Sequence, residues 1–153
     1  MTGALVAAGV LLAATVFGLV RRHRDGRLRV AGPRGGAAAR EASPLDEAHE
    51  RLDAGDLGTG LGERATLVQF SSAFCAPCRA TRRVLADVAA MVDGVAHVEI
   101  DAESHLELVR RLGVVRTPTV LVLDAAGRVV RRASGTPRKA DVIAALGTAV
   151  DPA

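Results

Sequence analysis

A regular alternation of apolar and polar positions begins at Glu63 and runs to Val150. Short apolar runs predict strands, and segments whose apolar residues recur every three or four positions predict helices. The pattern gives the order β-α-β-α-β-β-α. The predicted strands are 66–71, 95–100, 120–123 and 129–132, and the predicted helices are 75–91, 104–112 and 139–150.

The order of these elements predicts the fold class. Strands that alternate with helices pair in parallel through right-handed crossovers. The last two strands are separated only by residues 124–127, so we expect a hairpin that places strand 129–132, antiparallel, at the edge of the sheet. Ser104 and Glu107 are placed to form a capping box. We therefore expect residues 63–153 to form an α/β domain with a central mixed β-sheet flanked by helices.

The first twenty residues have a different pattern, since Gly3 to Val20 is uncharged and almost wholly apolar. These eighteen residues would form about 27 Å of helix, close to the ~30 Å hydrocarbon core of a bilayer. A cleaved signal peptide would have basic residues before its apolar stretch, whereas here the basic residues, beginning with Arg21 and Arg22, follow it. A buried core helix would show a polar face. We therefore expect residues 1–20 to be a transmembrane helix that anchors the protein in the cell membrane.

The flanking charges predict how this single span is oriented. Basic residues favour the cytoplasmic side of a membrane, and here they follow the span, beginning at Arg21. We therefore expect the domain in the cytoplasm; the alternative places it outside the cytoplasm. The same arginines either lie on anionic lipid headgroups or serve only to fix the topology.

Residues 21–62 are predicted to be a linker. Gly32-Pro33-Arg34-Gly35-Gly36 and the alanines that follow bury little surface and break regular structure. A short helix is expected at 44–54, with Ser43 as its N-cap and Gly55 at its end.

Composition restricts the core and the partners. The chain has three Phe and no Trp or Tyr, so Ala, Val and Leu must build the core. The net charge is +3, and seven arginines fall between Arg21 and Arg40. Because the excess of basic over acidic charge belongs to that segment, which has no aromatic residues for base stacking, we expect no nucleic-acid partner.

The only two cysteines, Cys75 and Cys78, stand two residues apart between a predicted strand and a predicted helix. A C-x-x-C pair in this α/β context is typical of a redox site. Zinc needs about four ligands, and only His97 and His105 are further candidates in the domain, so we expect no metal. A purely structural disulfide would close too small a loop to stabilise much.

Further motifs stand in a recognisable order around this pair. Residues 67–70, Leu-Val-Gln-Phe, precede residues 74–79, Phe-Cys-Ala-Pro-Cys-Arg, and Thr117-Pro118-Thr119 follows about forty residues later. In these motifs, and in the turn at 124–128, the chain resembles the thioredoxin family, whose fold the resemblance implies for residues 63–150. The opening strand and helix of a full thioredoxin are not evident.

The resemblance implies a thiol–disulfide oxidoreductase that needs no cofactor beyond a redox-active Cys75–Cys78 disulfide. Cys75 is expected at a helix N-terminus, where N–H groups and the helix dipole stabilise a thiolate, and is the expected nucleophile. Cys78 is expected to be shielded and to resolve the mixed disulfide. Pro118 either simply starts a strand or, as the resemblance implies, follows a cis peptide bond. The residues expected to contact substrate are Phe74, Ala76, Pro77, Thr117 and Pro118.

Three further residues are expected to tune the pKa values of the cysteines. Gln69 stands where thioredoxin has a buried Asp that moves a proton at the second cysteine, which Gln cannot do. His97 stands where a Lys often pairs with that Asp, and Arg79 adds positive charge beside Cys78. We therefore expect proton transfer at Cys78 to use water or another group.

These observations predict an enzyme that reduces protein disulfides, because the domain is expected in the cytoplasm, where thiols are kept reduced. The expected partners are protein disulfide substrates, a dithiol electron donor such as a thioredoxin reductase, and the membrane. One alternative is an extracytoplasmic oxidoreductase that serves exported proteins or cytochrome maturation. Another is a slow or inactive binding module that uses the groove beside Pro118.

Overall fold

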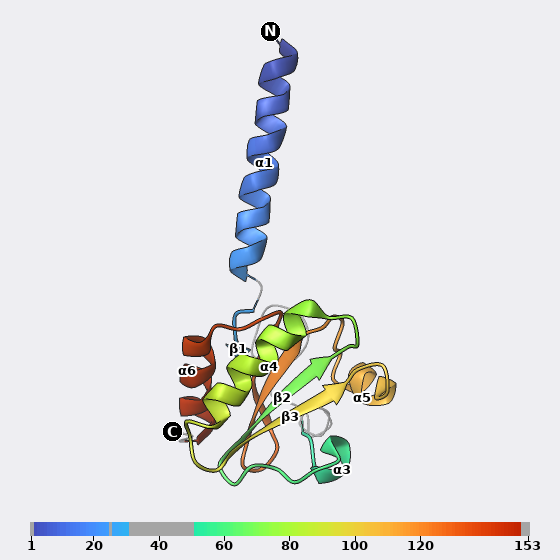
Figure 1. Cartoon of the computed structure of the whole chain (residues 1–153), viewed down its shortest axis with the longest axis vertical. Coiled ribbons are helices and arrows are strands. Elements are labelled where there is room, and N and C mark those ends of the chain that lie inside the picture. The colour runs from blue at the N-terminus through green and yellow to red at the C-terminus, as the bar shows by residue number, and fades with distance from the viewer. Residues whose placement is uncertain (1, 25, 31–50, 151–153) are drawn as a thin grey trace, which may run out of the picture.

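The computed structural model of the protein describes residues 2–24, 26–30 and 51–150, with the side chains of the first helix described from Val6 to Val20 (Figure 1). From β2 to α6 the elements follow the order β-α-β-α-β-β-α, as predicted. In chain order the elements are α1 (Thr2–Arg24), β1 (Arg29–Val30), α3 (Ala54–Leu57), β2 (Ala65–Ser71), α4 (Ala76–Ala89), β3 (Val95–Asp101), α5 (Leu106–Arg111), β4 (Thr119–Asp124), β5 (Val129–Ser134) and α6 (Lys139–Val150).

The strands form one mixed sheet in the order β1-β5-β4-β2-β3. Strand β2 is central and pairs in parallel with β3 and antiparallel with β4. Strand β5 pairs antiparallel with β4, as the predicted hairpin requires, but the prediction that β5 is an edge strand is wrong. Its outer side is covered by β1, which pairs antiparallel with it. After α1 the chain returns to the sheet beside β5, where the Gly26 N–H donates a hydrogen bond of 2.9 Å to the Ser134 carbonyl at the end of β5.

Two apolar clusters cover the two faces of the sheet. Helices α4 and α6 lie together on one face, and α5 lies toward the other (Figure 1). Phe70 is fully buried, whereas Phe17 and Phe74 are exposed, so the core is otherwise aliphatic, as the composition predicts. The largest buried side chains on the α4 and α6 face are Leu67, Leu85, Val88, Val120, Val122, Val142 and Leu146. Those on the opposite face include Leu52, Leu57, Val68, Phe70, Ile100, Leu108, Leu121 and Leu123.

The helix after β3 begins differently from the prediction. Helix α5 starts at Leu106, and its N-cap residue His105 makes no side-chain capping bond. The predicted capping box is therefore wrong. Ser104 instead donates its hydroxyl hydrogen to the Asp101 carboxylate at the end of β3, which keeps it away from the helix.

Parts of the expected linker belong to the fold. Leu52 is 1 % exposed and lies in the core, and its N–H donates a 2.9 Å hydrogen bond to the Gly127 carbonyl. The expected helix at 44–54 falls largely on residues 31–50, outside the described residues. Where it can be compared, it is wrong: α3 begins only at Ala54, because Asp53 and Asp56 form a capping box there.

Helix α1 is present where the apolar stretch predicts a helix, and its described side chains are exposed. Among the described residues, however, no helix combines the length and the apolar character that are needed to cross a membrane. The predicted transmembrane helix is therefore not confirmed.

Candidate functional site

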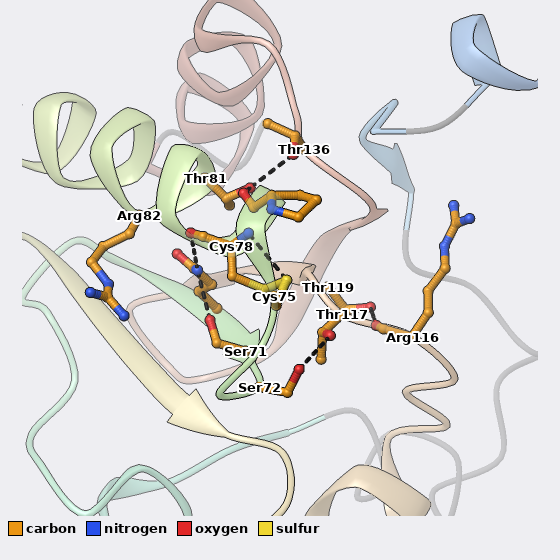
Figure 2. Close-up of a disulfide and its surroundings, with 12 residues drawn as sticks. Ser71, Ser72, Cys75, Cys78, Thr81, Arg82, Arg116, Thr117, Thr119 and Thr136 are labelled. Carbon is orange, nitrogen blue, oxygen red and sulfur yellow. Dashed lines mark hydrogen bonds between the residues drawn. A yellow bond between two sulfur atoms is a disulfide. The ribbon is translucent and has the colours of Figure 1, made fainter.

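Cys75 and Cys78 form a disulfide at the N-terminus of α4 (Figure 2). Cys75 is the N-cap residue and is partly exposed, whereas Cys78 is 2 % exposed. The Cys78 N–H donates to the Cys75 sulfur at 3.1 Å. An N–H directed at this sulfur and the dipole of the 14-residue helix would stabilise a Cys75 thiolate after reduction. The two cysteines therefore differ in both access and electrostatic support.

Sequence explains why α4 begins at this point. Pro77 occupies the first turn, where its missing N–H costs no helical hydrogen bond. Thr81, which is fully buried, donates its hydroxyl to the Pro77 carbonyl at 3.1 Å. The same hydroxyl lies 3.2 Å from the Thr136 hydroxyl, which joins the first turns of α4 to the loop before α6 (Figure 2). The sequence pattern did not indicate this role for Thr81.

The Thr117–Pro118 peptide bond is cis, as the resemblance implied. Pro118 is buried, and its carbonyl accepts a 2.7 Å hydrogen bond from the Gly135 N–H. The hydroxyls of Thr117 and Ser72 are 3.1 Å apart, which ties this loop to the segment leading into Cys75 (Figure 2). The structure therefore brings together two predicted parts of the site that are about forty residues apart in the sequence.

The other expected substrate contacts lie at the surface. Phe74 is 97 % exposed, and Ala76 and Pro77 are exposed beside it. Pro77 lines a groove together with Thr117 and Pro118. Their positions suit contact with a second molecule, and contact with substrate stays a prediction for these residues.

Gln69 is fully buried in β2 and lies next to the cysteine pair, as expected. Its Nε2 donates hydrogen bonds to the Ser71 hydroxyl (2.8 Å) and the Cys78 carbonyl (2.9 Å). Its Oε1 has no hydrogen-bond partner among the described residues. Gln69 therefore holds the backbone of Cys78 as a hydrogen-bond donor.

Glu99 and Arg82 form an ion pair beside Gln69 that the sequence did not indicate. Arg82 binds Glu99 through two nitrogens, at 2.6 and 2.7 Å, so its charge is committed to that carboxylate. Figure 2 shows Arg82 beside the active-site residues. Glu99 lies opposite Gln69 in the parallel register of β2 and β3. Burial raises the pKa of Glu99, but the hydrogen bonds from Arg82 and Ser71 outweigh it and hold the pKa below its ordinary value. The parallel pairing of the two strands was the signal that could have found Glu99.

Of Arg79 and His97, only Arg79 lines the pocket that both cysteines line. Arg79 is exposed and lines a pocket with both cysteines, Ser71 and Glu99. His97 is partly buried opposite Leu67. The pKa of its ring is lowered, mainly by burial and also by the positive charge of Arg82, although the negative charge of Glu99 raises it. Its Nε2 has no hydrogen-bond partner within the described part of the chain. The roles expected for these two residues stay predictions.

Comparison with known proteins identifies the family. The Thioredoxin family model matches residues 60–148, which is more than half of the chain. The chain belongs to the thioredoxin family. It is similar to a thioredoxin of Alicyclobacillus acidocaldarius, with 33 % identity over 86 residues that cover 56 % of this chain and 81 % of that protein.

Solved thioredoxin structures have the same fold. Chloroplastic thioredoxin z is 27 % identical, with a TM-score of 0.51 over 56 % of this chain and 78 % of its own. A mutant thioredoxin of Halobacterium salinarum is 20 % identical, with a TM-score of 0.53 over 58 % of this chain and 77 % of its own, and this likeness concerns the fold alone. The predicted thioredoxin-like α/β fold is confirmed.

Family membership and the Cys75–Cys78 pair together support thiol–disulfide oxidoreductase activity, as predicted. Thioredoxins use no cofactor beyond their active-site disulfide. In the part of the chain that the structure describes, no group of three or more His, Cys, Asp and Glu side chains could hold a metal ion. The division of the chain into anchor, linker and domain stays a prediction.

Proposed function

We propose that this thioredoxin reduces disulfide bonds in other proteins, with Cys75 as the nucleophile and Cys78 as the resolving cysteine. The observation that carries the proposal is the unequal setting of the two sulfurs. Cys75 is accessible and receives the Cys78 N–H, whereas Cys78 is buried behind it. A substrate disulfide can therefore reach Cys75 but not Cys78.

The reaction transfers two electrons from the cysteine pair to the substrate. The Cys75 thiolate attacks one substrate sulfur, forms a mixed disulfide, and releases the other substrate sulfur as a thiolate, which takes up a proton. Cys78 then loses its proton, and its thiolate attacks the Cys75 sulfur. The Cys75–Cys78 disulfide forms and the second substrate thiolate leaves. A dithiol donor, such as a thioredoxin reductase system, restores the reduced pair.

The proton on Cys78 needs an acceptor that Gln69 cannot supply. Gln69 Nε2 binds the Cys78 carbonyl as a donor, and the nearest carboxylate in this network is Glu99, with Oε1 3.5 Å from Gln69 Nε2. Both cysteines, Ser71 and Glu99 line one pocket, which is open to water. We assign the proton to water in this pocket, with Glu99 as the adjoining carboxylate.

We further propose that α1 holds the enzyme at the cytoplasmic face of the cell membrane. The support is the uncharged stretch from Gly3 to Val20 and the arginines that follow it. Large apolar side chains are also exposed around the described part of α1, where lipid would cover them. They are Val6, Val10, Leu11, Leu12, Val16, Phe17, Leu19 and Val20.

Reduction of insulin by the full chain, with dithiothreitol as donor, tests the redox proposal. We expect the wild type to accelerate precipitation of the insulin B chain, and Cys75→Ser to abolish the acceleration. A charge-altered control away from the cysteines, Arg83→Gln, should behave like the wild type. Absence of acceleration by folded wild-type protein would contradict the enzyme and favour a binding module.

Labelling in intact cells tests the proposed location separately. After treatment with a permeant reductant, an impermeant maleimide should leave Cys75 unmodified unless the cells are opened. Carbonate washing should leave the protein in the membrane fraction. Rapid labelling of intact cells would favour the extracytoplasmic alternative, and release by carbonate would contradict the anchor.

A further inference from the structure

A groove lies beside the active site on the side of the cis-proline loop. Pro77, Thr117 and Pro118 line it at the end next to the cysteines. Residues 26–28, which connect α1 to β1, line it as well, together with the loop before α6 and one side of α6 itself. The groove therefore extends from the disulfide region toward the segment that follows α1.

The charge of this groove is strongly one-sided. Among the described residues, four arginines line it and Asp141 is its only acidic lining residue, which gives a formal charge of +3. The pocket on the other side of the cysteines is balanced in charge, since its lining includes two arginines, Arg79 and Arg82, and two carboxylates, Glu99 and Asp101. Positive charge is therefore concentrated on the Pro118 side of the site. The four groove arginines are Arg27, Arg116, Arg131 and Arg138.

Each groove arginine is positioned by the fold. Gly26, next to Arg27, donates its N–H to Ser134 and has φ +80°, and an added Cβ there would lie 2.1 Å from the Thr136 carbonyl oxygen. Arg131 lies in β5, and Arg138 directly precedes α6. Arg116 donates to the Ser134 carbonyl at 2.9 Å and in Figure 2 extends away from the disulfide. The fold thus places the backbone of each of these arginines at the groove, and the Arg116 side chain is also held there by its hydrogen bond.

We propose that the groove binds an acidic segment of the polypeptide whose disulfide is reduced at Cys75. This inference rests on the proposed function, because that function makes a polypeptide the occupant. A chain that brings its disulfide to Cys75 and passes the Pro118 side enters a groove with a formal charge of +3. Guanidinium groups match carboxylates in geometry as well as in charge. Acidic residues on that side of the substrate cysteine would therefore favour binding and speed association.

Binding of two fluorescein-labelled peptides to the oxidised full chain in nonionic detergent tests the proposal without any redox step. Both peptides carry serine in place of cysteine; one has four glutamates on one side of that serine, and the other has four glutamines. The double variant Arg131→Gln/Arg138→Gln should weaken binding of the acidic peptide about 3- to 10-fold, as expected for two partly exposed ion pairs. Binding of the neutral peptide should not change.

The charge-matched control is Arg83→Gln/Arg110→Gln, which removes two exposed arginines outside the groove. It should change affinity for the acidic peptide by less than about 2-fold, the scale expected of distant screened charges. Arg138→Gln alone, at an exposed position before α6, gives the same test if the Arg131 change impairs folding. Equal affinity of the wild type for the two peptides, or equal losses in the two double variants, would overturn the proposal.

Two parallel measurements distinguish this proposal from the proposed function and from binding of lipid headgroups in the groove. Reduction of a neutral disulfide peptide by the same preparations tests the proposed function; if that reaction is absent, the binding data still decide whether the groove selects acidic segments. Flotation with phosphatidylserine and with phosphatidylcholine vesicles tests lipid headgroups as the occupant. If the groove variants reduce phosphatidylserine binding but leave peptide affinity unchanged, the groove binds lipid and the peptide proposal is wrong.

Discussion

Glu99 lies opposite Gln69 on the neighbouring parallel strand, and its Oε1 is 3.5 Å from Gln69 Nε2. Gln69 at the same time holds the Cys78 carbonyl, while Arg82 holds Glu99. The carboxylate of this site is therefore displaced by one strand from the position where the family has its buried acid. It is also paired with an arginine, which keeps it ionised.

Replacing Gln69 with leucine tests its part in holding the active-site helix. The change removes the donor to Ser71 and to the Cys78 carbonyl at a fully buried position. We expect the free energy of unfolding of the oxidised protein to fall by about 1–3 kcal/mol, because buried groups lose their partners. Urea titration measures this, with Arg83→Gln as a surface control. Unchanged stability would show that these hydrogen bonds contribute nothing net.

The ion pair between Glu99 and Arg82 should make the stability of the folded protein depend on pH in the acidic range. The folded pKa of Glu99 lies below its ordinary value of 4.5, so its contribution is present above that pH and is lost as the pH falls through the folded pKa. Glu99→Gln should therefore flatten the loss of stability below about pH 4.5. The change should be small, because the pair is open to solvent. Melting temperatures at pH 7 and pH 3.5 give the comparison; identical slopes in wild type and variant would contradict it.

His97 should act in a different pH window. Its folded pKa lies below the ordinary 6.5, so the unfolded chain binds the proton first as the pH falls. Stability attributable to His97 is thus present above about pH 6.5 and is lost as the pH falls through the folded pKa. His97→Gln should reduce the loss of stability between pH 7 and pH 5 in urea titrations. The matched variant is His105→Gln, and an equal reduction in both variants would speak against His97 as the source.

Gly26→Ala tests whether the segment after α1 is fixed to the domain. The alanine Cβ would meet the Thr136 carbonyl oxygen, and φ is +80° at this position. We expect a cost of about 1–3 kcal/mol for the docking of β1, from steric overlap and backbone strain. Hydrogen exchange of the amide at position 26 and of the β5 amides, compared between the wild type and the variant, would report it. Gly60→Ala, with no atom within 4 Å of the added Cβ, is the control; equal exchange in the two variants would contradict the docked segment.

Local sequence patterns predicted the elements that carry the active site. The apolar runs around Gln69 and Val120 gave β2 and β4 to within one residue, because buried strands need continuous apolar surface. The cis bond before Pro118 was predicted from the family resemblance, because the local sequence pattern alone does not distinguish a cis from a trans bond. Helix α6 has the predicted bounds, Lys139–Val150.

The remaining features depend on contacts between distant residues. The pairing of Arg82 with Glu99 requires the register of two strands and the placement of α4 above them. The return of β1 to β5 involves only two residues of strand, too few to give an alternating pattern. Ser104 had the right spacing for a capping box, but the Asp101 carboxylate competes for its hydroxyl. Such competition is decided by tertiary structure.

The central claim is that Cys75 attacks the substrate and Cys78 resolves the mixed disulfide. The most direct test is mass spectrometry of the full chain after reaction with an oxidised peptide, for the reduced variants Cys78→Ser and Cys75→Ser side by side. We predict that Cys78→Ser accumulates a mixed disulfide through Cys75, because its attacking sulfur is accessible and the resolving sulfur is missing. Cys75→Ser should remain unmodified, because Cys78 is buried. A mixed disulfide that forms only in Cys75→Ser would contradict the account.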